Sequence, residues 1–127
     1  MKIEQIKKIM KKYGKAWETK DPDLIIECFT KNGIYQESPL KKPYKGHKEI
    51  KDFWKKAVVN SQKNINFKLG KVYVSNDGKT GFAEWKCKGK WKQNNTWKKV
   101  KRAGIMILKM NKDKISCLNE YWNTKNT

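Results

Sequence analysis

Residues 81–91, which read GFAEWKCKGKW, alternate between two kinds of side chain. Every second position is small, apolar or aromatic, and the positions between them are Glu84 and lysines from residue 84 onward. Successive side chains of a β-strand point to opposite faces of a sheet, so this alternation predicts a strand over residues 80–92 with one buried face. That face carries Ala83, Trp85, Cys87, Gly89 and Trp91. Glu84 and the lysines are then expected in water.

A period of two extends along the C-terminal half of the chain. Further strands are expected near residues 64–75, 97–110 and 114–123. The turns between the four strands are Asn76-Asp77-Gly78, Gln93-Asn94-Asn95 and Asn111-Lys112-Asp113. Asparagine, aspartate and glycine tolerate the positive φ values that tight hairpins require. The sequence therefore predicts four long antiparallel strands.

The N-terminal part of the chain has helical periodicity instead. Apolar residues recur every three or four positions and predict a helix over residues 2–19, whose stripe is Ile3, Ile6, Met10, Tyr13 and Trp17. Lys20 and Asp21 end this helix, and Asp21 followed by Pro22 begins a second helix within DPDLIIECF, residues 21–29.

A short strand and a third helix complete the first half. Asn32-Gly33 is expected to be a turn, IYQES (34–38) a short strand, and LKKPYKG (40–46) a loop. The third helix is HKEIKDFWKKAV (47–58), and its buried side is Ile50, Phe53, Trp54, Ala57 and Val58. Helices segregated to one face of an antiparallel sheet make an α+β domain. We therefore expect a single domain over residues 1–127, a cone-shaped curved sheet wrapped around three N-terminal helices, with a small-molecule pocket at its open end.

Composition limits the other classes of protein. The 127 residues include 37% hydrophobic residues, too many for a disordered chain, and no apolar run approaches the length of a membrane helix. Lysines interrupt the N-terminal apolar residues, unlike in a signal peptide, so a cytoplasmic protein is expected. Cys28, Cys87 and Cys117 are widely spaced and His47, expected to be exposed, is the only histidine. That pattern favours free thiols and predicts no metal site and no cofactor.

The formal net charge of +19 raises the question of a nucleic-acid partner. Arg102 is the only arginine among 31 basic residues, although arginine is the side chain that contacts bases and phosphates bidentately. Trp85, Trp91 and Trp97 alternate with lysines in residues 84–102, which is the composition of a single-strand binder. Strand parity points Trp85 and Trp91 away from the lysines, so nucleic acid is not the expected partner, and the class stays open as the last alternative.

Four segments resemble successive parts of one protein family: YGKAWETKDPDLIIECF (13–29), GIYQESP (33–39), GHKEIKDFW (46–54) and KISCLNEYW (114–122). Their order and spacing are similar to those of ketosteroid isomerase-like and SnoaL-like proteins of the nuclear transport factor 2-like superfamily. The resemblance covers about Tyr13 to Trp122 and implies a cystatin-like roll. It also implies two catalytic residues, because Tyr13 matches the tyrosine that donates to the substrate oxyanion and Glu37 falls at the position of the general base.

The sequence departs from that family pattern in the oxyanion site. The second oxyanion donor, a protonated aspartic acid in the isomerases, aligns with Met106, which donates no hydrogen bond. The tyrosines that support the catalytic tyrosine are replaced by Phe29 and Trp54, of which only Trp54 keeps a donor. Steroid isomerisation by the family mechanism is therefore not expected.

Parity and the resemblance together place a set of side chains around the predicted pocket. Its aromatic wall is Trp17, Tyr35, Phe53, Trp85 and Trp122, with Trp54 and Met106 beside them. Its ionisable groups are Glu37, Arg102 and Glu120, and Arg102 is expected to pair with Glu120 because an inward carboxylate needs a partner. The alternatives are ordinary ones: an aromatic core without a cavity, a structural ion pair and a strand-end carboxylate.

Two predictions about function and assembly follow. The protein is expected to hold a small, partly apolar molecule, as an isomerase or dehydratase with Glu37 as base and Tyr13 as donor, or as a non-catalytic ligand-binding protein. Ile105 and Ile107 lie on the outer sheet face, where an apolar patch among lysines predicts a homodimer interface.

Overall fold

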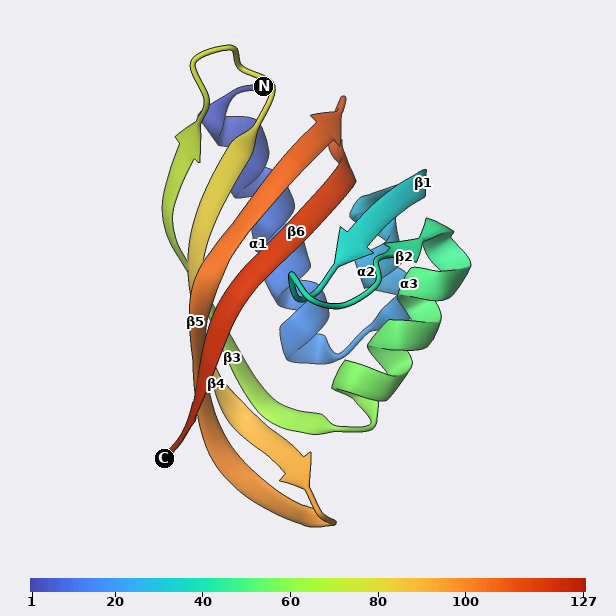
Figure 1. The fold of residues 1–127 in the computed structure, drawn as a ribbon, viewed down its shortest axis with the longest axis vertical. Helices are drawn as coiled ribbons and strands as arrows, with labels where there is room; N and C mark the ends of the chain where they lie inside the picture. The colour runs from blue at the N-terminus through green and yellow to red at the C-terminus, as the bar shows by residue number, and fades with distance from the viewer.

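The computed structural model describes residues 1–127 as a curved sheet with helices packed against its concave side (Figure 1). In chain order the elements are α1 (Ile3–Thr19), α2 (Pro22–Glu27), β1 (Phe29–Gln36), β2 (Tyr44–Lys45), α3 (Gly46–Trp54), the π-helical turn η1 (Lys55–Val59), β3 (Gln62–Val74), β4 (Gly81–Gln93), β5 (Thr96–Asn111) and β6 (Lys114–Asn126). The α+β class and the curved sheet around three helices are confirmed.

The first helix and the start of the second are as the sequence predicts. The apolar stripe of α1 is buried at Ile6, Met10, Tyr13 and Trp17, so this helix lies against the sheet with its lysines outward. Lys20 ends α1 in the left-handed conformation, with φ of 56°. The Asp21 side chain then caps α2 by accepting hydrogen bonds from two backbone N–H groups, and proline occupies the first turn.

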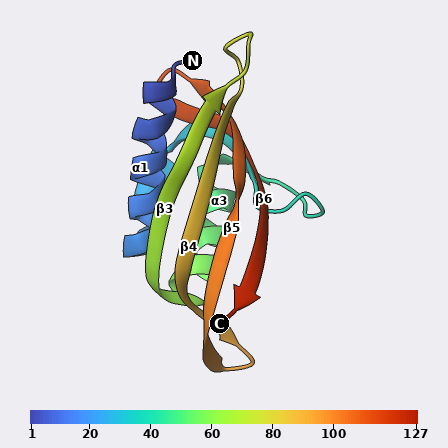
Figure 2. The ribbon, with the colours of Figure 1, turned by 90° about the vertical axis from the view of Figure 1, so that its left-hand side faces the viewer.

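The sheet has six strands in the order β2-β1-β6-β5-β4-β3. The four long strands are antiparallel neighbours within a few residues of the predicted bounds, and β1 adds to β6 in parallel. Figure 2 shows β3, β4, β5 and β6 side by side from the outer face, with α3 behind them. The outer rows contain lysines directly opposite one another, as in Lys88–Lys101–Lys125.

Four local predictions were wrong. Phe29 does not end a helix but begins β1, and Asn32-Gly33 lies within this strand rather than in a turn. The expected loop over 40–46 contains the two-residue strand β2, which pairs with β1 through Tyr44 and Lys45. His47 is half-buried rather than exposed, because its Nε2 lies 3.0 Å from the Phe29 carbonyl oxygen, which ties the start of α3 to β1.

One hydrophobic core fills the space between α1, α3 and the concave sheet face. In β4, Ala83, Trp85 and Cys87 are buried and Glu84 is exposed, so the predicted alternation is confirmed. Cys28 and Cys87 are buried free thiols and Cys117 is partly exposed. None of the helices combines the length and the apolar character that crossing a membrane demands.

Candidate functional site

A cavity of about 240 Å³ lies between the helices and the concave face of the sheet. Helices α1 and α3 and the turn η1 form one wall, and β1, β4, β5 and β6 form the other. Its aromatic lining consists of Trp17, Tyr35, Phe53, Trp54, Trp85, Trp91 and Trp122. Its ionisable and amide lining consists of Glu37, Lys41, Gln62, Arg102 and Glu120. A cavity of this size can hold a small molecule, and the few polar side chains that line it can orient that molecule.

Glu120 is the most deeply buried acid of the cavity. It is 4% exposed and its two carboxyl oxygens accept hydrogen bonds from two phenols: Oε1 from Tyr13 at 2.7 Å and Oε2 from Tyr35 at 3.1 Å. Burial raises the pKa of Glu120 to about 7, and the two hydrogen bonds oppose that rise without cancelling it. The group therefore changes its charge near neutral pH.

Tyr13 is placed behind Glu120 rather than in the cavity wall. Its side chain is fully buried, with its ring edge-on to Trp17 and Trp54, and its hydroxyl is committed to Glu120. Burial and the neighbouring Glu120 raise the pKa of Tyr13 well above its ordinary value, so the hydroxyl keeps its proton and remains a donor. Burial and Glu120 also raise the pKa of Tyr35 well above its ordinary value, and Tyr35 does line the cavity.

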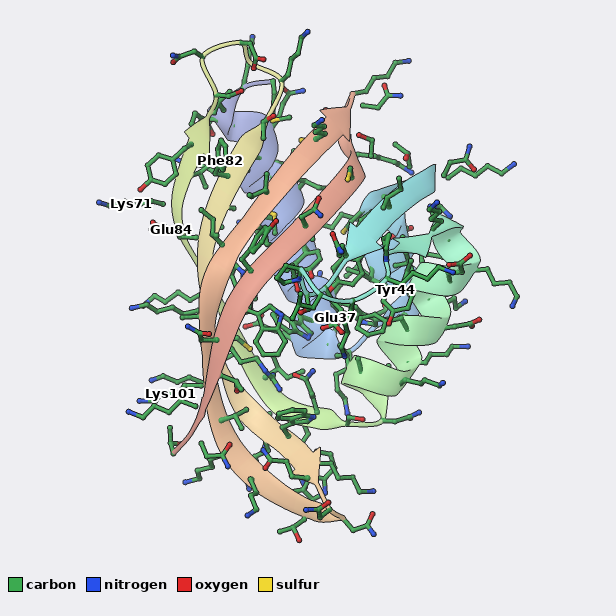
Figure 3. The ribbon with its side chains drawn as sticks, viewed as in Figure 1. Glu37, Tyr44, Lys71, Phe82, Glu84 and Lys101 are labelled. Carbon is green, nitrogen blue, oxygen red and sulfur yellow. The ribbon has the colours of Figure 1, made fainter.

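Glu37 follows the end of β1 at the rim of the cavity. Its carboxylate is nearly buried and lies 3.0 Å from Lys41 Nζ, while its backbone carbonyl accepts a 2.6 Å hydrogen bond from Trp122 Nε1. The contact with Glu37 raises the pKa of Lys41. Figure 3 shows Glu37 and Tyr44 between the sheet and the helices, whereas Lys71, Glu84 and Lys101 point away from the outer face.

Arg102 is buried in β5 without an acidic partner. It is 6% exposed, its guanidinium donates one 2.7 Å hydrogen bond from Nη1 to Gln62 Oε1, and it lies 5.1 and 5.7 Å from the ring centres of Trp91 and Trp122. Gln62 is itself fixed by a 2.8 Å hydrogen bond from its Nε2 to the Ala57 carbonyl in η1. Burial lowers the pKa of Arg102.

The predicted pairing of Arg102 with Glu120 is wrong. No carboxylate oxygen lies within 4.0 Å of the guanidinium. In the register of β5 with β6, Arg102 is opposite Thr124 and Glu120 is opposite Met106. Four residues of strand separate the two, roughly 13 Å, which is why the side chains line the same cavity without meeting.

The structure brings most of the predicted site together. Trp17, Tyr35, Phe53, Trp54, Trp85, Trp122, Glu37, Arg102 and Glu120 all line the cavity. Tyr13 and Met106 do not, because Tyr13 sits behind Glu120 and Met106 is fully buried in the core. No cluster of three or more metal-ligating side chains is present.

Six lining residues were not predicted as part of the site: Lys41, Ala57, Val58, Ser61, Gln62 and Trp91. Trp91 was placed on the inward face of its strand by parity, and that signal alone could have added it to the site. Gln62 had no such signal, because β3 begins two residues before the predicted strand.

Comparisons with known proteins agree with this fold. The SnoaL-like domain model matches residues 10–117. Among solved structures, the epoxide hydrolase/cyclase-like enzyme SalBIII superposes with a TM-score of 0.81 at 18% identity, covering 95% of each chain. A suggested isomerase from Bacillus subtilis gives a TM-score of 0.82 at 22% identity, covering 97% of this chain and 90% of its own.

A third structure, a ketosteroid isomerase-like protein from Erwinia carotovora atroseptica, gives a TM-score of 0.72 at 13% identity, covering 98% and 95% of the two chains. At these identities the solved structures show the fold alone. No curated protein matches the sequence. The family model spans most of the chain, from residue 10 to residue 117, and the chain therefore belongs to the SnoaL-like domain family.

Proposed function

We propose that this protein is an acid–base enzyme of the isomerase or lyase type, acting on a small, partly apolar molecule in the inner cavity. The observation that carries the proposal is Glu120, a buried carboxyl with a pKa of about 7 that lines the cavity. A proton carrier is most effective when its pKa lies near the working pH, because both of its forms are then populated. Two tyrosine hydroxyls hold its oxygens in fixed positions.

In this proposal Glu120 takes a proton from one carbon of the substrate and returns it to another atom. The hydroxyls of Tyr13 and Tyr35 stabilise the carboxylate form of Glu120 by donating hydrogen bonds to it. Tyr13 therefore positions Glu120 and does not contact the substrate. Glu37, which was predicted as the base, is the second candidate, because its carboxylate lies on the same cavity but is held by Lys41. The aromatic wall supplies the apolar surface that a partly apolar substrate requires.

The test is proton exchange at carbon, which needs no knowledge of the natural product. Small enolisable compounds such as phenylacetone and benzoylacetate are incubated with the protein in deuterated buffer, and loss of the α-proton signal is followed by NMR. We expect exchange that rises as pH increases through about 7, as Glu120 loses its proton. Glu120→Gln should lose most of it, whereas Glu84→Gln on the outer face should not. An unchanged rate in Glu120→Gln would refute the proposal, and Glu37→Gln measures the alternative base.

A non-catalytic ligand-binding protein is the second candidate. It is favoured by the absence of an oxyanion donor where the isomerase pattern places it, because the Tyr13 hydroxyl is engaged with Glu120 and Met106 lies in the core. Binding requires a fitting cavity, whereas catalysis requires groups that contact the transition state. Ligand binding without any exchange at carbon, for every compound that binds, would establish this candidate instead.

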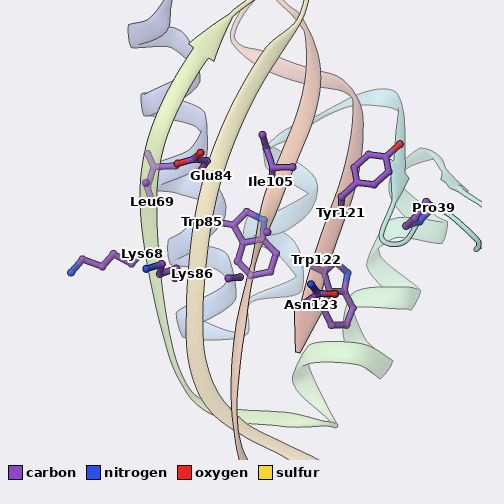
Figure 4. A pocket seen from close by; sticks show the side chains of 13 residues that line it. Pro39, Lys68, Leu69, Glu84, Trp85, Lys86, Ile105, Tyr121, Trp122 and Asn123 are labelled. Atoms are coloured by element: carbon purple, nitrogen blue, oxygen red, sulfur yellow. The ribbon is translucent and has the colours of Figure 1, made fainter. Parts of the chain in front are cut away.

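Assembly as a homodimer through the outer sheet face remains a proposal. An open groove of about 920 Å³ crosses this face, and Figure 4 shows Glu84, Ile105, Tyr121 and nearby lysines along it. The Tyr121 side chain is 43% exposed on this face. A two-fold contact would cover the apolar side chains of this groove.

A further inference from the structure

The guanidinium of Arg102 is a buried positive charge that no acid neutralises. Of its N–H groups, only Nη1 has a hydrogen-bond partner in the protein, the neutral amide oxygen of Gln62. The neighbouring rings of Trp91 and Trp122 attract the cation weakly but accept no conventional hydrogen bond. A buried charge is costly unless it is paired, so an arginine in this setting is most simply explained by an anion that the protein does not itself supply.

The carboxylates, the lysine and the amide of the cavity already have partners within the chain. Glu37 is paired with Lys41, both oxygens of Glu120 are bonded to tyrosine hydroxyls, and both ends of the Gln62 amide are engaged. The indole Nε1 atoms of Trp17, Trp54 and Trp85 are unpartnered as well, but they are buried beneath the cavity surface. Arg102 is therefore the cation of the cavity lining that has no acidic partner.

We infer that the cavity binds a small carboxylic acid, with its carboxylate on the free edge of the Arg102 guanidinium and its apolar body against the tryptophan wall. A planar guanidinium matches a planar carboxylate through two parallel hydrogen bonds. Gln62 bonds only Nη1, so it fixes the orientation of the guanidinium plane and leaves its other edge free. This inference deepens the proposed function by naming the ligand class of the same cavity, and it rests on that cavity rather than on proton transfer.

The position of Arg102 relative to Glu120 fits such a ligand. The two residues lie on neighbouring strands, offset by four residues in register, and both line the cavity. An acid anchored by its carboxylate at Arg102 extends its apolar part toward Glu120. A second negative charge nearby would oppose binding, and Glu120 avoids this when it is protonated. Carboxylate binding should therefore weaken as pH rises through about 7.

The experiment compares two probes that differ only in charge at one end, phenylacetate and phenylacetamide. Binding is measured by titration calorimetry and by quenching of tryptophan fluorescence, in low and high salt. High salt suppresses attraction to the exposed lysines more than to a buried arginine. We expect phenylacetate to bind about tenfold to a hundredfold more tightly than phenylacetamide, the range of a hydrogen bond to a charged group. That ratio should persist in high salt.

Two variants test the assignment to Arg102. Arg102→Gln removes the charge, and Gln62→Glu keeps the arginine but places a carboxylate where the amide oxygen lies 2.7 Å from Nη1. Both should bring the ratio to about one. Lys101→Gln, which removes an exposed outward charge from the adjacent position of β5, should leave the ratio unchanged. Melting temperatures identify any variant that fails to fold. If one of the two variants fails, the binding ratio of the other tests the assignment to Arg102.

Equal binding of the two probes, binding of neither, or a ratio that survives both variants would overturn the inference. The outcome is separable from that of the proposed function. Glu120→Gln should keep the preference for the carboxylate while it loses exchange at carbon. If the protein prefers the carboxylate but shows no proton exchange at carbon, the inferred ligand class holds and the proposed catalysis is refuted. If it shows exchange but no preference for the carboxylate, the proposed catalysis holds and the inferred ligand class is refuted.

Discussion

Replacing Glu120 by glutamine should change how the stability of this protein depends on pH. In the folded protein the pKa of Glu120 is about 7, whereas its ordinary value is 4.5. A carboxyl whose pKa is raised by folding binds more protons in the folded state than in the unfolded state between those two pH values. Its contribution to stability is therefore full below pH 4.5 and is lost as pH rises through about 7. About 2.5 pH units at about 1.4 kcal/mol each amounts to about 3 kcal/mol.

The assay is urea unfolding of the wild type and of Glu120→Gln at a series of pH values across this window. Subtracting the two free energies of unfolding removes the groups that both proteins share, including Glu37, Lys41 and His47. The free energy of unfolding of the wild type minus that of the variant should fall by about 3 kcal/mol between pH 4.5 and about pH 7. Above that pH the difference should stay constant. A difference that is flat across the window would refute the reasoning, because Glu120 would then titrate alike in the folded and unfolded chains.

Three further predictions follow from contacts described above or from the backbone. Tyr13→Phe removes a 2.7 Å hydrogen bond to Glu120, so proton binding by that carboxyl, followed by NMR titration, should strengthen about tenfold to a hundredfold; an unchanged titration would contradict the assignment. Gly104→Ala places a Cβ 2.3 Å from the Tyr121 carbonyl oxygen and should cost about 1–3 kcal/mol of unfolding free energy, whereas Gly70→Ala, with its nearest atom at 3.2 Å, should cost less. Ile105→Lys should convert a dimer to a monomer in sedimentation experiments if the outer face is the interface, and a monomeric wild type would exclude that interface.

The fold was predictable because its signals are local. The switch from helical to alternating periodicity separates the helices from the long strands, and Asp21-Pro22 and the asparagine-rich turns fix most of the boundaries. Phe29 was assigned to the wrong element because its position suits the apolar side of a helix and the first residue of a strand equally well. Only pairing with β6 selects the strand, and pairing is not local.

The site was predictable by face but not by depth. Parity and helical spacing tell which side of a strand or helix a residue occupies, and nearly all of the inward residues proved to line the cavity. Parity and helical spacing do not tell how deep a residue lies between the open end of the cone and its closed end. For that reason Met106 was placed beside the cavity wall and Tyr13 was expected to reach the substrate. For the same reason Arg102 was paired with an acid four residues away in register. Strand register and the taper of the cone arise from the whole sheet, which no short segment encodes.

The orientation of Arg102 in the cavity depends on the π-helical winding of the turn η1. Its Ala57 carbonyl accepts from the side chain of Gln62, and Gln62 in turn orients the arginine. Wider winding of this kind corresponds to one extra residue inserted in an α-helical turn. Deleting one residue between 55 and 59 would convert the segment to an ordinary α-helix and rotate the Ala57 carbonyl away from the Gln62 amide. Gln62 would then no longer hold the Arg102 guanidinium in place. Such a deletion would thus weaken the binding of a carboxylate without changing any residue of the sheet.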